Sequence, residues 1–154
     1  MDDREMRQTI GRLVEHEDAL ATLYSLYAES CPADAELWRA LAADETTHAG
    51  WVLQLLKLVR CGDVAVDPRA ISGAAVATSL GYVHNAINEC QTHGVGRITA
   101  LCIGRDLENS IIENRFYELF KLESESQQAV RHGLERETLR HRQMIELRLR
   151  ELET

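Results

Sequence analysis

Residues 41–56 read LAADETTHAGWVLQLL and hold the pattern that decides the fold. Apolar residues in this part of the chain recur every three or four positions, as they do on the buried face of an α-helix. Two polar residues, Glu45 and His48, occupy positions in that apolar stripe. The pattern therefore predicts an amphipathic helix over 34–61 that carries a carboxylate and an imidazole on its buried face.

The same periodicity predicts three further long helices, near 3–31, 96–121 and 126–152. Pro32 separates the first two helices, and Gly62 supplies a glycine-type end to the second. Residues 63–93 contain glycines, a proline and one shorter helical stretch, so we interpret them as a long crossover that bears its own helix. A crossover of this length lets the third long helix run parallel to the second, unlike the helices of a simple up-down bundle.

The composition indicates one soluble, all-α domain over residues 1–154. The chain has a formal net charge of -8 and no basic face, so we expect no nucleic-acid partner. No apolar run approaches the ~18 residues that span a bilayer, and the first ten residues do not resemble a signal peptide. Its four scattered cysteines are expected to be reduced thiols. We therefore expect a cytoplasmic protein with no membrane partner.

Polar residues interrupt the apolar stripe of every long helix near its middle. Glu17 lies in the first helix, Glu108 in the third and His141 in the fourth, beside Glu45 and His48 of the second. Buried carboxylates without partners cost several kcal/mol each, whereas a pair of divalent cations would compensate them. Oxygen and imidazole ligands suit iron or manganese.

Residues 13–56 and 98–145 resemble the two halves of a rubrerythrin-like domain of the ferritin-like superfamily. The first half places a glutamate two turns before Tyr24 and continues with Leu-Ala-x-x-Glu-x-x-His. The resemblance implies a ferritin-like four-helix bundle with the crossover between its second and third helices, and a di-iron site. Thr138 stands where the fourth helix of the family has a glutamate, and neighbouring Glu137 is the candidate substitute. The resemblance implies the following metal ligands: Glu17, Glu45, His48, Glu108, Glu137 and His141.

The function that this resemblance implies is a di-iron carboxylate oxidoreductase that reduces peroxide or dioxygen. Its cofactors would be two metal ions, most readily iron, with manganese as the alternative. Rubrerythrins proper carry a rubredoxin-type iron centre, but this chain has no CxxC pair, so a separate electron donor is expected. We also expect a homodimer, with Trp38 and Trp51 as packing or interface residues.

Two other functions stay open at this point: a non-catalytic iron-binding or iron-handling protein, and a helical interaction module with a degenerate metal site. Glu17 and Glu108 could instead form salt bridges with arginines, for which Arg105 and Arg115 are the nearest candidates. Glu113 is a less favoured ligand, because it lies five residues after Glu108 and off the apolar stripe.

Overall fold

The structure is a computed structural model that describes residues 2–154, apart from the side chains at positions 111 and 114. It is mostly helical, and the predicted all-α class is confirmed. The α-helices are α1 Asp3–Ser30, α2 Ala35–Arg60, α3 Gly73–His93, α4 Arg97–Glu108, α5 Ile111–Arg115 and α6 Glu125–Glu153. Short 3-10 turns cover Pro32–Asp34 and Phe116–Leu119, and two-residue strands cover Ala65–Val66 (β1) and Phe120–Lys121 (β2).

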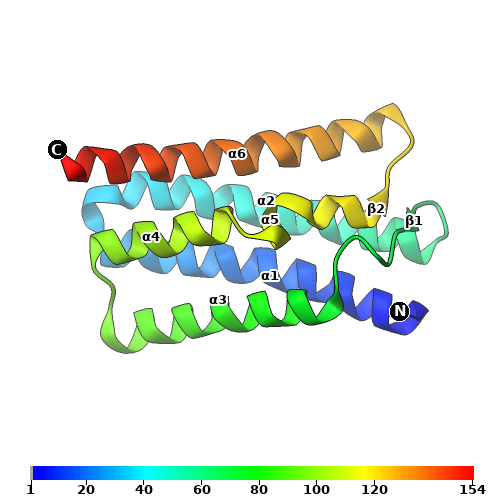
Figure 1. The fold of residues 1–154 in the computed structure, drawn as a ribbon, viewed down its shortest axis with the longest axis horizontal. Helices are drawn as coiled ribbons and strands as arrows, with labels where there is room; N and C mark the ends of the chain where they lie inside the picture. Colours follow the sequence, from blue (N-terminus) through cyan, green and yellow to red (C-terminus); the bar gives the residue numbers. More distant parts are fainter. Residues whose placement is uncertain (1) are drawn as a thin grey trace.

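The long helices lie side by side along one axis (Figure 1). Helix α1 packs against both α2 and α3, and α4 packs against α6. In Figure 1, α2 and α4 run in the same direction, and α3 returns the chain between them along the outer side of α1. The segment predicted as a crossover with its own helix therefore contains α3. None of the helices in residues 2–154 has an apolar stretch long enough to cross a membrane.

The helix ends follow from local sequence signals. Asp2 caps α1 in a capping box with Glu5, and Ser124 caps α6 in the same way with Gln127. Helix α1 stops before the Cys31-Pro32 pair, because a residue that precedes proline avoids helical geometry. Gly62, at φ +80°, follows the end of α2 in the left-handed region that glycine adopts without strain.

Asp34 stands at the N-cap position of α2, but its side chain makes no capping hydrogen bond. It is buried and instead accepts two hydrogen bonds from the Arg97 guanidinium, at 2.6 and 2.9 Å. Arg148 lies 3.3 Å from the same carboxylate. Since Arg97 begins α4 and Arg148 belongs to α6, this charge cluster joins the α1–α2 connection to the other pair of helices.

The prediction of one continuous helix over 96–121 is wrong. Helix α4 ends at Glu108, and Ser110 caps the separate helix α5 by accepting a hydrogen bond from the Glu113 N–H at 3.3 Å. The cause is local, because Ser-x-x-Glu is a helix-start signature and asparagine before it is a weak helix former. Beyond α5 the chain turns into β2, which pairs antiparallel with β1, so a small two-stranded sheet was also missed.

The buried apolar side chains that the structure describes form two hydrophobic clusters. One contains Leu23, Tyr24, Tyr27, Trp38, Leu101 and Ile145, and the other contains Ile10, Leu13, Val52, Phe116 and Leu134. The stretches that separate these clusters along α1, α2, α4–α5 and α6 carry the polar residues of the apolar stripes. Trp38 is fully buried and serves packing, whereas Trp51 is partly buried and stacks on His48 with ring centroids 5.5 Å apart.

Candidate metal centre

Five of the predicted ligands meet between the helices. They are Glu17 from α1, Glu45 and His48 from α2, Glu108 from α4 and His141 from α6, and none of them is more than 1 % exposed. Their positions follow from the helical period, because residues in the apolar stripe of each helix face the same interior. Two further buried residues, His16 of α1 and Glu113 of α5, join them.

These seven residues form one row in which carboxylates alternate with imidazoles. We name it the carboxylate–imidazole row; its order is Glu113, His16, Glu17, His48, Glu45, His141, Glu108. The Nδ1 atom of His48 lies 3.1 Å from Oε2 of Glu45 and 3.6 Å from Oε2 of Glu17. The Nδ1 atom of His141 lies 3.1 Å from Oε1 of Glu45 and 3.6 Å from Oε2 of Glu108.

The remaining end of the row repeats this arrangement. The Nδ1 atom of His16 lies 3.3 Å from Oε1 of Glu113 and 3.7 Å from Oε1 of Glu17. Glu17 and Glu45 thus each direct one carboxylate oxygen to one histidine and the other oxygen to the next. Among the described residues, three groups of possible metal ligands result, each with one imidazole nitrogen and two carboxylate oxygens within 4.8 Å of one another.

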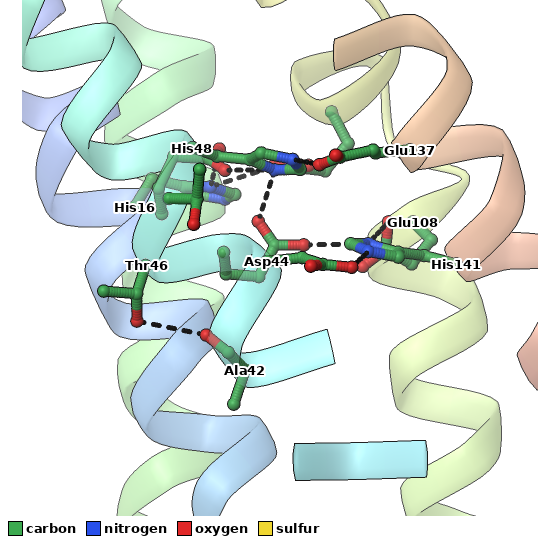
Figure 2. A network of polar contacts seen from close by, with 12 residues as sticks. His16, Ala42, Asp44, Thr46, His48, Glu108, Glu137 and His141 are labelled. Carbon is green, nitrogen blue, oxygen red and sulfur yellow. Dashed lines mark hydrogen bonds and ion pairs between the residues drawn. The ribbon is translucent and has the colours of Figure 1, made fainter. Parts of the chain in front are cut away.

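Each imidazole of the row is held from outside through its other ring nitrogen. Nε2 of His48 contacts a carboxylate oxygen of Glu137, and Nε2 of His141 donates to Oδ2 of Asp44 at 2.9 Å (Figure 2). Nε2 of His16 forms a 2.8 Å hydrogen bond with the Ser79 hydroxyl. Metal-bound histidines in proteins are oriented in this manner, with the distal nitrogen bonded to a carboxylate, carbonyl or similar acceptor.

Several atoms that face into the row make no hydrogen bond although they are buried. They are both carboxylate oxygens of Glu17, Oε1 of Glu45, Oε1 of Glu113, and Nδ1 of His16 and of His141. Buried polar atoms are nearly always hydrogen-bonded, so a concentration of exceptions at one place requires an explanation. Cations held in the three ligand groups would satisfy these atoms.

The separations of the ligand atoms also suit a shared ion. Metal ions bind imidazole nitrogen and carboxylate oxygen at about 2.0–2.2 Å, so two ligands at 90–110° around one ion lie about 2.8–3.6 Å apart. The nitrogen–oxygen distances of the row run from 3.1 to 3.7 Å. A direct charge-assisted hydrogen bond would be shorter, at about 2.7–2.9 Å. The residues could therefore hold a metal ion through oxygen and nitrogen ligands.

Without metal, the histidines of the row hold protons in place of the cations. Burial alone would lower their pKa values, but close contact with the negatively charged glutamates on either side outweighs it. The pKa rises to about 12 at His48, about 11 at His141 and about 10 at His16. Because an imidazole nitrogen must lose its proton before it binds a metal, metal binding here would release protons.

The carboxyl groups at the two ends of the row respond to burial in the opposite sense to the imidazoles. Burial raises the pKa of Glu113 to about 7, and the charge of Glu17 adds to the effect. Burial likewise raises the pKa of Glu108. The Tyr24 hydroxyl donates a 2.7 Å hydrogen bond to Oε1 of Glu108. Burial, with the charge of Glu108, raises the Tyr24 pKa well above its usual value, so this tyrosine stays protonated and remains a donor.

Glu137 lies outside the three ligand groups. Its side chain is 31 % exposed and contacts Nε2 of His48, the ring nitrogen that points away from the row. Thr138 is buried at the position where the family pattern has a glutamate. In the described structure, helix α6 thus contributes His141 to the groups and no carboxylate.

The arginines considered as alternative partners bind elsewhere. Arg105 pairs with Asp106 at 3.2 Å, and Arg115 pairs with Glu118 at 2.8 Å. Glu17 and Glu108 instead face the imidazoles of the row. None of the four cysteines belongs to the ligand groups found among the described residues, so these groups contain oxygen and nitrogen ligands alone.

The sequence did not predict that His16 and Asp44 contact the row, and it placed Glu113 off the buried face, whereas Glu113 is buried. His16 precedes Glu17, and its buried position could have been inferred only from α3, which covers this side of α1 and supplies Ser79. A continuous helix over 96–121 would put Glu113 off the buried face. The Ser-x-x-Glu signature that begins at Ser110 indicates instead that a new helix starts there. Asp44 adjoins Glu45, and no periodicity predicts its contact with His141.

Comparison of the chain with models of protein families, with curated proteins and with solved structures gave no match. The site must therefore be interpreted from its own residues.

Proposed function

We propose that the protein binds a pair of first-row metal ions, most readily iron, in the two ligand groups that share Glu45. Glu17, Glu45 and His48 would hold one ion, and Glu45, Glu108 and His141 would hold the other. The observation that carries this proposal is the position of the Glu45 carboxylate between two histidines. One of its oxygens lies 3.1 Å from His48, and the other lies 3.1 Å from His141. A carboxylate placed in this way can bridge two ions.

We further propose that the fold is the ferritin-like four-helix bundle and that the site is of the rubrerythrin-like type. The order of the helices supports this proposal, because α2 and α4 run in the same direction and α3 connects them (Figure 1). The distribution of the ligands supports it too, since di-iron carboxylate bundles draw one glutamate from each of two helices and a Glu-x-x-His pair from each of the other two. The chain departs from that pattern at Thr138.

The chemistry that we propose is reduction of peroxide or dioxygen. Ferrous ions, when bound, would supply the electrons, and two electrons with two protons convert hydrogen peroxide to two water molecules. The hydrophobic clusters on both sides of the row exclude bulk water from the site. Tyr24 holds one oxygen of Glu108 through its 2.7 Å hydrogen bond, which leaves the other oxygen facing His141. Reductant would come from a separate donor.

Metal content and turnover test the proposal in two steps. Protein purified without chelator should contain iron, or bind about two ferrous ions per chain anaerobically at its tight positions. The ferrous protein should then consume hydrogen peroxide faster than a His48→Ala variant does, and His84→Ala is a matched control because His84 is exposed. Bound iron without turnover would identify an iron-binding protein, and a chain that binds no metal would leave the interaction-module hypothesis.

We also propose a homodimer. Large apolar side chains are exposed on four helices, namely Leu53, Tyr82, Ile98, Leu139 and Leu147. A symmetric pair of chains would cover part of this surface. Light scattering that detects only the mass of one chain at micromolar concentration would contradict this proposal.

A further inference from the structure

We propose that the row contains a third metal position, formed by His16, Glu17 and Glu113. It adjoins the proposed pair through Glu17, which is shared with the His48 group. The inference goes beyond the proposed pair, because neither His16 nor Glu113 is needed to hold the two ions that share Glu45. The ligand would be a divalent first-row metal ion, as at the other positions.

The geometry of this end of the row repeats that of the other two groups. Nδ1 of His16 lies 3.3 Å from Oε1 of Glu113 and 3.7 Å from Oε1 of Glu17. The three residues are no more than 1 % exposed. Nε2 of His16 is fixed by the Ser79 hydroxyl at 2.8 Å, which turns Nδ1 toward the two carboxylates. All the groups needed to orient a metal ligand are therefore present.

The lack of hydrogen bonds at this end of the row distinguishes a metal position from a structural ion pair. Nδ1 of His16, both oxygens of Glu17 and Oε1 of Glu113 make no hydrogen bond although all are buried. An imidazolium that served only to neutralise Glu113 would be expected to close to hydrogen-bonding distance, about 2.7–2.9 Å. The separations here, 3.3 and 3.7 Å, are wider than that and close to the spacing of ligands around a common ion.

The third position should bind more weakly than the pair. Its outer partner is a neutral hydroxyl, whereas the outer partners of His48 and His141 are the carboxylates of Glu137 and Asp44. A carboxylate in this role raises the basicity of the imidazole that it holds. Charge acts in the same direction, because two divalent cations already balance the four carboxylates of the row and a third adds excess positive charge.

Anaerobic titration with Co²⁺ tests the inference, with visible absorption and metal analysis as readouts. The wild-type protein should show two tighter binding steps and one weaker step. Both His16→Gln and Glu113→Gln should remove the weaker step, lower the final stoichiometry by one ion per chain, and leave the tighter steps in place. His93→Gln, at an exposed position on α3, is the matched control. Circular dichroism confirms that each variant is folded, and either variant alone suffices.

Two outcomes would overturn the inference. One is a wild-type protein that binds only two ions and keeps both in the His16→Gln and Glu113→Gln variants, which would make His16 a structural ion-pair partner. The other is a third step that survives both substitutions. Failure of the proposed two-ion site would be recognised separately, because the His48→Ala and His141→Ala variants would then bind as much Co²⁺ as the wild-type protein. Even if the two-ion site failed in this way, a Co²⁺ binding step that is lost in His16→Gln but kept in His48→Ala and His141→Ala would support the third position.

Discussion

Replacement of Glu45 by glutamine is the most informative perturbation of the row. Glutamine keeps the shape of the side chain but removes the negative charge, and its amide has one oxygen instead of two equivalent ones. Oε2 of Glu45 faces His48 and Oε1 faces His141, each at 3.1 Å. One substitution should therefore weaken metal binding at two positions at once, whereas Glu108→Gln should weaken it at one.

The magnitude follows from the number of contacts. Even the loss of an outer partner of a metal ligand costs about 10–100-fold in affinity, so the loss of a direct ligand should cost at least that much at each position. The product of the two binding constants should fall roughly 100- to 10,000-fold, or about 3–5 kcal/mol in total. In the metal-free protein the cost should be about 3 kcal/mol, near the lower limit for breaking a buried ion pair, because both histidines keep a second carboxylate.

Anaerobic calorimetric titration of Fe²⁺ or Mn²⁺ into the wild-type protein, Glu45→Gln and Glu108→Gln would measure these changes. Metal analysis after gel filtration would give the number of ions bound. Glu36→Gln is the control on the same helix, because Glu36 is exposed. If Glu45→Gln loses affinity at one position only, as Glu108→Gln does, then Glu45 does not bridge and the two-ion arrangement is wrong.

Four further predictions follow from the structure. His48→Ala should remove more metal than His141→Ala, because His48 lies between the two shared carboxylates of the row; equal losses by metal analysis would contradict the asymmetry. Thr138→Glu should supply the missing carboxylate of α6, tightening metal binding in titrations at least 10-fold while lowering the melting temperature of the metal-free protein. That metal-free protein should also melt at lower temperature as pH rises from 7 to 9, because the row histidines have pKa values raised from 6.5 to about 10, about 11 and about 12. The protonated histidines contribute fully to the free energy of unfolding below pH 6.5, and this contribution is lost as the pH rises toward their raised pKa values. The loss is up to roughly 1.4 kcal/mol per pH unit for each proton that the folded protein retains. Protein saturated with metal should not show this trend. Gly104→Ala should destabilise the fold by about 1–3 kcal/mol in chemical denaturation, because a Cβ there would lie 2.8 Å from the buried Trp38 ring.

Periodicity predicted the parts of this structure that depend on long helices. The stripes of α1, α2 and α6 were recognised because apolar residues and their polar interruptions recur at helical spacing over many turns. Glu17, Glu45, His48 and His141 meet because each occupies the buried stripe of a helix that continues unbroken through the site. The crossover helix α3 was predicted too, but its contact with His16 through Ser79 was not, because no local pattern encodes which helix covers which side of α1.

The end of α4 explains why the rest of the site could not be predicted. Glu108 and Glu113 are five residues apart, and in one continuous helix their side chains would point about 140° apart. A continuous helix would therefore bury one of these glutamates and expose the other. The break at Asn109 and Ser110 turns the chain, so that both glutamates are buried, with Glu108 beside His141 and Glu113 beside His16.

The same break determines how many carboxylates the row contains. Thr138 is buried on α6 where the resemblance predicts a glutamate, and the turn after α4 brings Glu113 of α5 to the other end of the row. The row thus contains four carboxylates, and His16 of α1 is its third imidazole. The proposed third ion tests the role of this end of the row directly, because its ligands would be His16, Glu17 and Glu113.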